Sequence, residues 1–405
     1  MRTLVLALGV MLAACTGVEG QSAPTDAAAG APWPSDPPNA DGQTPAFPNQ
    51  TRAPAIHSGI TLNVEAVVSG LDHPWGIAFL PDRSILVTER PGRMRLVSAA
   101  GVLSEPIAGV LPVVAESQGG LLDVAISPDF ASDRLVYWSF SEPRGGNRNA
   151  TSVARGRLSE DGARLTDVRV IFRQEPAWAS NNHFGSRLVW DRQGHLFVTL
   201  GERAEVDSRN LARSLDNDLG KVVRINADGS IPADNPLVGR ANARGEIWSS
   251  GHRNVQGAAL HPETGQLWTI EHGPRGGDEL NAPKAGLNYG WPDVTYGEDY
   301  SGQPINEGIT AREGVEQPIY YWDPVIAPSG MTFYQGQRFP WRGDVLIASL
   351  KGALVRLELD GERVTGEERL LTDVGRVRDV VEGPDGAIYV ITDDDNGRLL
   401  RLTPR

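Results

Sequence analysis

The chain has 405 residues and a formal net charge of −13, with 38 Lys and Arg against 51 Asp and Glu. This acidic balance argues against nucleic acid or an anionic membrane surface as the main ligand. The single cysteine excludes an internal disulfide framework and a thiolate metal cluster. The length allows one large domain or two ordinary ones.

The N-terminus has the pattern of an export signal. A short basic start, Met1-Arg2-Thr3, precedes the apolar run Leu4–Leu12, which is too short to span a bilayer. The next residues, Leu12-Ala13-Ala14-Cys15, resemble the lipobox of bacterial lipoproteins, in which the cysteine is lipidated. The alternative is an ordinary secretory signal with a chance cysteine. We predict a signal peptide over residues 1–15 and an exported, periplasmic protein that meets the membrane through a lipid on Cys15.

Residues 16–58 are rich in Pro, Ala, Gly, Ser and Asp. Such a segment has too few apolar groups to offset the entropy lost on ordering. We therefore predict a flexible tether over residues 16–58 and a folded domain over residues 59–405.

From Ile60 onward, short β-runs alternate with Gly, Pro and Asp turns, and one unit recurs. Each unit has an apolar run, a turn, a second apolar run and a later outer strand. The six copies begin at His73, Gly120, Asn181, Asn254, Ser329 and Arg378. Radially packed blades would bury each sheet against its neighbours, so the repeat predicts an all-β, six-bladed β-propeller. A pair of β-sandwiches is the alternative, but it would not need one motif six times.

The third unit contains a histidine at the start of a strand. His183 lies between Asn182 and the pair Phe184-Gly185, where the backbone changes direction. Its unperturbed pKa near 6.5 allows it to act as a neutral base close to neutral pH. The alternative is a capping or loop histidine. His195, inside the same hairpin, is interpreted as structural.

Basic and polar residues recur where the first strand of a unit begins. If the loops before these strands gather at one mouth of the channel, these side chains form a ring suited to a compact polyanion. Lys351 joins the ring from the far end of a second run. The alternative is a set of solvated loop residues. The members of the ring are Gln118, His183, Arg253, Asn254, Lys351, Arg376 and Arg378.

The fourth unit carries a dense acidic and glycine-rich segment, from Glu271 to Asn281. Asp278 and Glu279 offer carboxylates, and the turn around Pro274 offers unpaired backbone carbonyls. Ca²⁺ takes such oxygen ligands, so the segment is a candidate calcium site. The alternative is a polar turn with solvated acids.

Seven motifs in this chain resemble, in the same order, those of the soluble PQQ-dependent (quinoprotein) sugar dehydrogenases, closest to their aldose sugar dehydrogenase branch. The resemblance covers nearly everything from Gly59 to Leu402. The motifs are Ser117-Gln-Gly-Gly-Leu-Leu-Asp-Val-Ala, Asn182-His-Phe-Gly-Ser-Arg-Leu, Gly251-His-Arg-Asn-Val-Gln-Gly, Glu271-His-Gly-Pro, Gly286-Leu-Asn-Tyr-Gly-Trp-Pro, Ser349-Leu-Lys and Arg376-Val-Arg-Asp-Val.

The resemblance implies a six-bladed propeller that oxidises aldoses at C1 to lactones. His183 would be the catalytic base, and hydride would pass from C1 to PQQ. A calcium ion would link PQQ to the carbonyls of Gly273 and Pro274, and Glu279 and Tyr289 match a second, structural calcium site. An unidentified acceptor would take the electrons. The residues that match the family's cofactor contacts are Gln118, Arg253, Asn254, Tyr300, Lys351, Arg376 and Arg378.

Some features do not carry over from the family. The loop from Trp322 to Gly330 corresponds only loosely to a cofactor-side loop, and no sugar-contacting residues can be matched. We therefore expect a broad aldose range. One rival function is a calcium-dependent lactonase or other hydrolase on the same fold, which would have no use for Lys351, Arg376 and Arg378. The other is a non-catalytic, lipid-anchored binding propeller, which would need no base at position 183.

Overall fold

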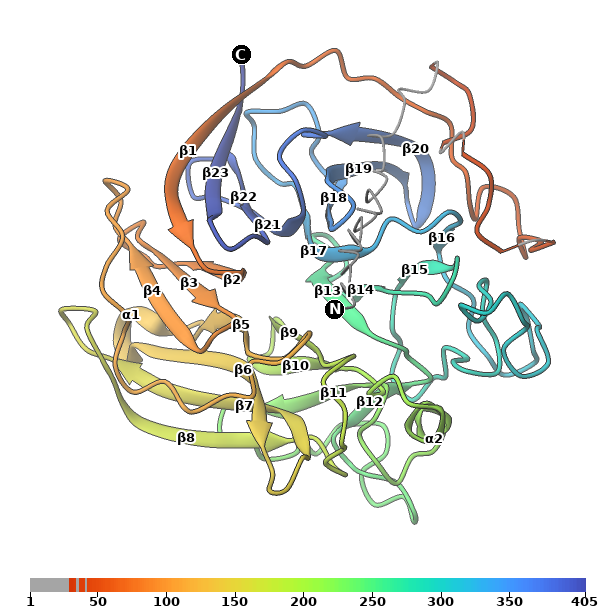
Figure 1. Cartoon of the computed structure of the whole chain (residues 1–405), viewed down its shortest axis with the longest axis horizontal. Coiled ribbons are helices and arrows are strands. Elements are labelled where there is room, and N and C mark those ends of the chain that lie inside the picture. The colour runs from red at the N-terminus through yellow and green to blue at the C-terminus, as the bar shows by residue number, and fades with distance from the viewer. Residues whose placement is uncertain (1–28, 34–35, 41) are drawn as a thin grey trace, which may run out of the picture.

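The computed structural model describes residues 29–33, 36–40 and 42–405. The predicted signal peptide and Cys15 lie outside these residues. In the described part, six antiparallel sheets surround a common axis (Figure 1). The predicted all-β, six-bladed propeller is confirmed.

Each sheet is one blade, and its strands run in order from the centre outward. Blade 1 consists of β2 (Pro74–Phe79), β3 (Ile85–Glu89) and β4 (Arg93–Val97). Blade 2 consists of β5 (Leu121–Ile126), β6 (Leu135–Pro143), β7 (Asn149–Leu158) and β8 (Leu165–Arg173). Blade 3 consists of β9 (Gly185–Trp190), β10 (His195–Leu200), β11 (Lys221–Asn226) and β12 (Ile247–Ser250).

The remaining three blades follow in chain order. Blade 4 consists of β13 (Val255–Leu260), β14 (Leu267–Glu271), β15 (Asp278–Asn281) and β16 (Tyr320–Trp322). Blade 5 consists of β17 (Pro328–Phe333), β18 (Val345–Ser349), β19 (Ala353–Asp360) and β20 (Arg363–Leu370). Blade 6 consists of β21 (Val377–Glu382), β22 (Ile388–Thr392), β23 (Gly397–Pro404) and β1 (Leu62–Leu71).

The N-terminal strand closes the ring. β1 pairs antiparallel with β23, so blade 6 contains both ends of the propeller (Figure 1). The innermost strands β2, β5, β9, β13, β17 and β21 contact one another in sequence, and β21 contacts β2 again. Closure leaves fewer open sheet edges and holds the first and last blades together.

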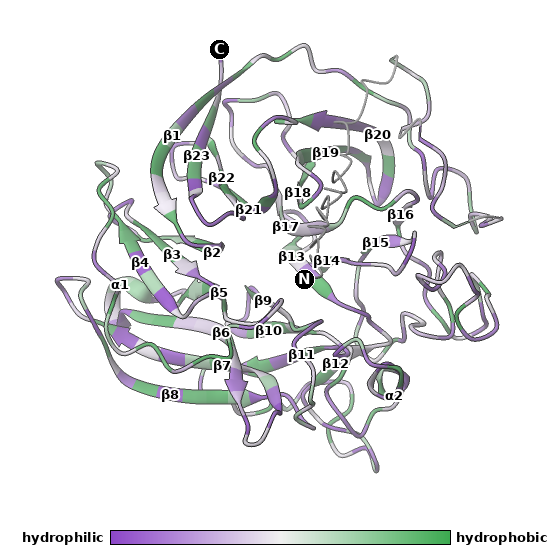
Figure 2. Ribbon diagram, in the orientation of Figure 1, coloured by the Kyte–Doolittle hydropathy of each residue, from purple (hydrophilic) through white to green (hydrophobic). Residues whose placement is uncertain are grey.

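The hydrophobic core lies between blades rather than in one central mass. The second strands β3, β14, β18 and β22 are buried along their whole length. A separate apolar cluster fills each junction between neighbouring blades, for example Leu346, Val380 and Val390 between blades 5 and 6. Hydrophobic residues accordingly recur along the strands of every blade (Figure 2). This arrangement leaves the axis free for polar side chains.

Helices are short in the described residues. They are α1 (Phe130–Asp133), α2 (Val206–Arg209) and the 3₁₀ turn η1 (Asn210–Arg213). No helix in this part of the chain has the length and apolar character to cross a membrane.

The prediction of a flexible tether is wrong for the residues between 29 and 58 that the structure describes. Trp33 is only 3% exposed, and Ala53 packs into the apolar cluster between blades 4 and 5. The Ile56 N–H donates to the Glu367 carbonyl at 3.0 Å, and the Glu367 N–H donates to the Pro54 carbonyl at 3.0 Å. The segment therefore covers the outer edge strand β20. The composition of the segment shows how few apolar residues it has. It does not show that some of these residues pack against the propeller.

Candidate active site

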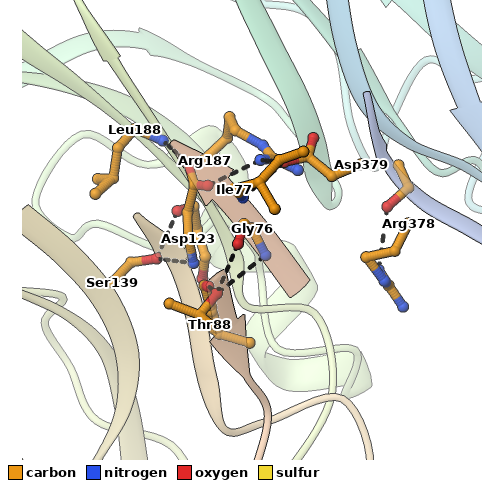
Figure 3. Close-up of polar contacts among 12 residues, drawn as sticks. Gly76, Ile77, Thr88, Asp123, Ser139, Arg187, Leu188, Arg378 and Asp379 are labelled. Atoms are coloured by element: carbon orange, nitrogen blue, oxygen red, sulfur yellow. Dashed lines mark hydrogen bonds and ion pairs between the residues drawn. The ribbon is translucent and has the colours of Figure 1, made fainter. Parts of the chain in front are cut away.

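The residues at the third positions of the six inner strands are of only two kinds, glycine and charged residues. Three of these are glycines, and the other three form the central polar cluster of Asp123, Arg187 and Asp379 (Figure 3). A Cβ at Gly76 would lie 2.7 Å from Asp123 Oδ1, and a Cβ at Gly330 would lie 1.9 Å from Asp379 Oδ1. Glycine at these positions therefore makes room for the charged side chains at the axis.

Arg187 joins the two carboxylates of this cluster. Its Nη1 donates to Asp123 Oδ1 at 2.8 Å and to Asp379 Oδ2 at 3.1 Å. The Leu188 N–H donates to Asp123, and the Ile77 N–H donates to Asp379. Burial raises the pKa of Asp123 to about 6, although Arg187 opposes that shift. The cluster links blades 1, 2, 3 and 6.

A cavity of about 340 Å³ lies at the ends of the inner strands, next to the central polar cluster. Four of the side chains at the second positions of these strands line it, and loop residues complete the wall. The lining residues are Trp75, Arg90, Ser117, Gln118, Leu122, Phe184, Gly185, Asn254, Gln256, His272, Ala327, Leu350, Arg376 and Arg378.

His183 lies beside this cavity and is paired with a carboxylate. Its Nδ1 is 2.8 Å from Glu202 Oε2, and both side chains are buried. The His183 N–H donates to Gln118 Oε1 at 2.9 Å, and Gln118 and Phe184 line the cavity. His183 has a positive φ of 49°, which is uncommon for residues other than glycine although histidine adopts it more readily than most.

The surroundings of His183 favour the neutral imidazole. Burial lowers the pKa of His183, Glu202 raises it, and the nearby Arg253 and Arg203 guanidinium groups lower it. The pKa of Glu202 is also below its usual value because His183 and Arg253 outweigh the effect of burial. An ionised carboxylate can only accept hydrogen bonds, so Nδ1 of His183 carries the hydrogen that it donates to Glu202. Nε2 is then left with its lone pair.

Arginines supply positive charge to the cavity. Arg378 Nη2 donates to Asp393 Oδ2 at 2.8 Å, and Arg376 Nη2 donates to the same oxygen at 3.0 Å. The Arg376 side chain is 53% exposed, whereas Arg378 is buried. Among the described residues, the Nε atoms of Arg90 and Arg378 are buried without a hydrogen-bond partner. One carboxylate therefore holds two cations, and the cavity keeps net positive charge for a ligand.

The structure brings together part of the predicted ring. Gln118, Asn254, Arg376 and Arg378 line the cavity, and His183 lies beside it. Asn254 Oδ1 accepts from the Gly185 N–H at 3.0 Å, which connects blades 3 and 4.

Three other predicted cofactor contacts do not line this cavity. Arg253 lines a smaller neighbouring cavity, and its Nη1 donates to the Gly273 carbonyl at 2.7 Å. Lys351 is exposed and follows the lining residue Leu350. Tyr300 is 72% exposed. A role in cofactor binding stays a prediction for each of them.

The predicted calcium ligands Gly273, Pro274, Glu279 and Tyr289 all line the smaller cavity, which has a volume of about 10 Å³. Its carboxylates are Glu271 and Glu279. Burial and the charge of Glu271 raise the pKa of Glu279 well above its usual value. Asp278 accepts from the Gly273 N–H and does not line the cavity.

An unpaired acceptor lies beside these carboxylates. Asn281 Nδ2 donates to Glu271 Oε1 and to Glu279 Oε2, each at 3.2 Å. Asn281 Oδ1 is buried without a hydrogen-bond partner among the described residues. Among the residues that the structure describes, no group of three or more His, Cys, Asp and Glu side chains is arranged to hold a metal ion, so backbone oxygens would have to complete a cation site.

Sequence reasoning missed the residues that follow the second strands of the blades. Arg90 follows β3, Glu202 follows β10 and His272 follows β14, whereas the predicted ring was drawn mainly from residues before the first strands. Hairpin register would have found Glu202. Leu200 pairs with Gly185, so extending the hairpin by two residues on each strand brings Glu202 opposite His183.

A model of the glucose/sorbosone dehydrogenase family matches residues 71–401. The chain belongs to this family. The resemblance inferred from the seven motifs is thereby confirmed.

This chain is similar to other proteins in sequence and in three-dimensional structure. The aldose sugar dehydrogenase YliI from Escherichia coli strain K12 is 48% identical over 352 residues, which span 85% of this chain and 94% of the relative. The apo crystal structure of the soluble aldose sugar dehydrogenase from E. coli has a TM-score of 0.82 and 46% identity, covering 85% of this chain and all of that one. The PQQ-bound aldose sugar dehydrogenase from Streptomyces coelicolor has a TM-score of 0.68 and 28% identity, covering 85% and 99% of the two chains.

Proposed function

We propose that this dehydrogenase oxidises aldose sugars at C1 to lactones, with PQQ and calcium bound, and passes the electrons to a separate acceptor. The observation that carries the proposal is the buried His183–Glu202 pair beside a cavity bordered by three arginines. The names of the similar proteins support it, because they specify aldose sugars and, in one structure, bound PQQ.

The larger cavity suits a compact polyanion with an aromatic core. PQQ has three carboxylates, and Arg90, Arg376 and Arg378 give the wall of this cavity the positive charge that carboxylates require. When bound, PQQ would supply a quinone carbonyl carbon that accepts hydride from C1 of the sugar.

His183 would act as the general base. With Nδ1–H donated to Glu202, its Nε2 lone pair can accept the proton of the sugar C1 hydroxyl. Glu202 holds the ring in this tautomer and stabilises the imidazolium that forms after proton transfer. Burial lowers the pKa of His183 and so keeps the base neutral, although Glu202 opposes that shift.

The smaller cavity is the site that we propose for calcium. Gly273 and Pro274, whose carbonyls are oxygen donors, line it together with the carboxylates of Glu271 and Glu279, and the Gly273 carbonyl also accepts from Arg253 Nη1. The residues that line the cavity include all four ligands that the resemblance divides between two calcium sites. A cation there would also relieve the repulsion between Glu271 and Glu279.

Export and anchoring belong to the same proposal. The basic start, the apolar run and Cys15 favour a periplasmic enzyme held to a bacterial membrane by a lipid. Labelling of the expressed chain with a radioactive fatty acid, compared with a Cys15→Ser variant, tests the lipid. Equal labelling of both forms would contradict this part.

Reconstitution tests the enzymatic proposal. The purified apoprotein should reduce an artificial electron acceptor with glucose and other aldoses only after PQQ and Ca²⁺ are added. Product analysis should show the lactone and then its hydrolysed acid. Inactivity across a broad sugar and alcohol panel, in a preparation with native circular dichroism, would refute the dehydrogenase. Hydrolysis of lactones without PQQ would favour the rival hydrolase instead.

A further inference from the structure

A segment before the propeller lies against the side of blades 4 and 5. This strap, defined as residues 36–40 and 42–58, runs past β16 and β20 before the chain enters β1 (Figure 1). The Tyr321 N–H donates to the Gln50 carbonyl at 2.8 Å, and the Gln50 side chain is fully buried. The strap precedes residues 71–401, which the family model matches.

The strap makes its densest polar contacts with one loop. This wall loop, residues 323–327, connects β16 to β17. The Ala40 N–H donates to Asp323 Oδ2 at 3.2 Å, and Arg52 Nη2 donates to the Asp323 carbonyl at 2.7 Å. In return, the Val325 N–H donates to Asn39 Oδ1 at 2.9 Å. Asp323 is buried, and its bond with the Ala40 N–H is buried as well, which shields that bond from water.

The other end of the wall loop forms part of the larger cavity. Ala327 lines that cavity, and its carbonyl accepts from the N–H of Leu350, another lining residue, at 2.9 Å. The N–H groups of Ile326 and Ala327 donate to Asp278 Oδ2, each at 2.8 Å. The other oxygen of Asp278 accepts from the Gly273 N–H, also at 2.8 Å. One carboxylate therefore holds both the wall loop and the backbone of the smaller cavity.

The wall loop needs support from outside itself. It has no strand pairing of its own between Asp323 and Ala327, and Ala327 adopts a positive φ of 50°. A backbone in that region is strained for alanine and persists when its surroundings hold it. On one side the surroundings are Asp278, and on the other they are Asn39, Ala40 and Arg52 of the strap.

We propose that the strap is a positioning element for the cofactor: its contacts with Asp323 and Val325 hold the wall loop in the conformation that shapes both cavities. This inference rests on the proposed function, since it takes the larger cavity as the PQQ site. A preorganised wall reduces the ordering cost of binding, so loss of the strap contacts weakens cofactor affinity more than turnover.

The test uses the full chain with Asn39→Ala and Arg52→Ala combined. The matched control is Ser58→Ala, which removes a strap contact to Glu368 on blade 5, away from the wall loop. Hydrogen exchange is followed at Ile326, Ala327 and Gly273, whose direct acceptor, Asp278, is unchanged in both variants. PQQ is then titrated into each apoprotein, and kcat is measured at saturating PQQ.

In the double variant we expect exchange at these three amides to become about tenfold faster, and the Kd for PQQ to rise about tenfold, as for the loss of one or two hydrogen bonds. The kcat at saturating PQQ and the melting temperature should stay close to those of the wild type. The Ser58→Ala control should change neither exchange nor Kd.

Two results would overturn the inference. One is a wild-type Kd for PQQ in the double variant, and the other is the same rise in Kd for Ser58→Ala. If the wild-type chain itself binds no PQQ, the proposed function fails. In that case exchange at Ile326 and Ala327 decides whether the strap positions the wall loop, with unchanged rates counting against it.

Discussion

Replacing Glu202 with glutamine removes the negative charge next to His183 and preserves the size of the side chain. The His183 Nδ1–Glu202 Oε2 contact of 2.8 Å is a charge-assisted hydrogen bond between two buried groups. Hydrogen bonds to charged groups contribute about 1.5–3 kcal/mol. If that bond stabilises the imidazolium formed during proton transfer, its loss lowers kcat by about 10- to 150-fold.

The pH dependence gives a second readout with a definite sign. Glu202 raises the pKa of His183, so its removal should lower that pKa further below the usual value. The base is active when neutral, and activity is lost as the pH falls through its pKa. The acidic limb of the kcat/KM profile should therefore lie below pH 6.5 in the wild type, and at a still lower pH in Glu202→Gln.

The assay is steady-state reduction of an artificial acceptor by the PQQ- and calcium-loaded enzyme between pH 4 and pH 9. Asp191→Asn is a matched control, because Asp191 Oδ2 lies 2.8 Å from Nδ1 of His195 in the same blade. That variant should retain wild-type kcat. An unchanged kcat in Glu202→Gln, or an acidic limb that moves to higher pH, would refute the assigned role of Glu202.

Four further predictions concern His183, the cations proposed to bind PQQ, the proposed calcium ligand Glu279 and the central polar cluster. His183→Ala should lower kcat about 10²- to 10⁴-fold while PQQ titrations stay unchanged, and surviving turnover would contradict its role as base. Arg378→Ala and Lys351→Ala should mainly raise the Kd for PQQ, measured by titration of the apoprotein; unchanged Kd values in both would remove the polyanion argument. Glu279→Gln should reduce the rise in melting temperature that Ca²⁺ causes, followed by calorimetry with EDTA as the reference, and an equal rise would place calcium elsewhere. Arg187→Met should lower stability at pH 7 by about 3–5 kcal/mol, because two buried carboxylates lose their shared cation, and thermal unfolding measures this. Since the pKa of Asp123 is raised to about 6 in the folded protein, this loss should shrink as the pH falls and the carboxylate takes up a proton; a loss that is constant with pH would contradict the reasoning.

The amino-acid sequence by itself determined the architecture of this protein. Six copies of a run–turn–run unit each encode a hairpin, and hairpins are local structures whose strands and turns can be read from alternation and from Gly, Pro and Asp. The same repeat placed His183, Gln118, Asn254 and Arg378 at equivalent starts of inner strands, because position within a repeat is preserved when the repeats close into a ring.

The tertiary structure alone decided which of these residues act together. The Arg187 cluster requires four blades to meet at one axis, whereas the contact between His183 and Glu202 follows from extending the register of one hairpin beyond its last paired residues. Loop paths, which no local pattern encodes, leave the predicted cofactor contacts Tyr300 and Lys351 exposed, and their role in cofactor binding stays a prediction. The strap shows the same limit, because its composition is that of a tether and its docking depends on a surface that the propeller forms. Local patterns encode strands, whereas contacts between distant loops depend on how the closed ring arranges them.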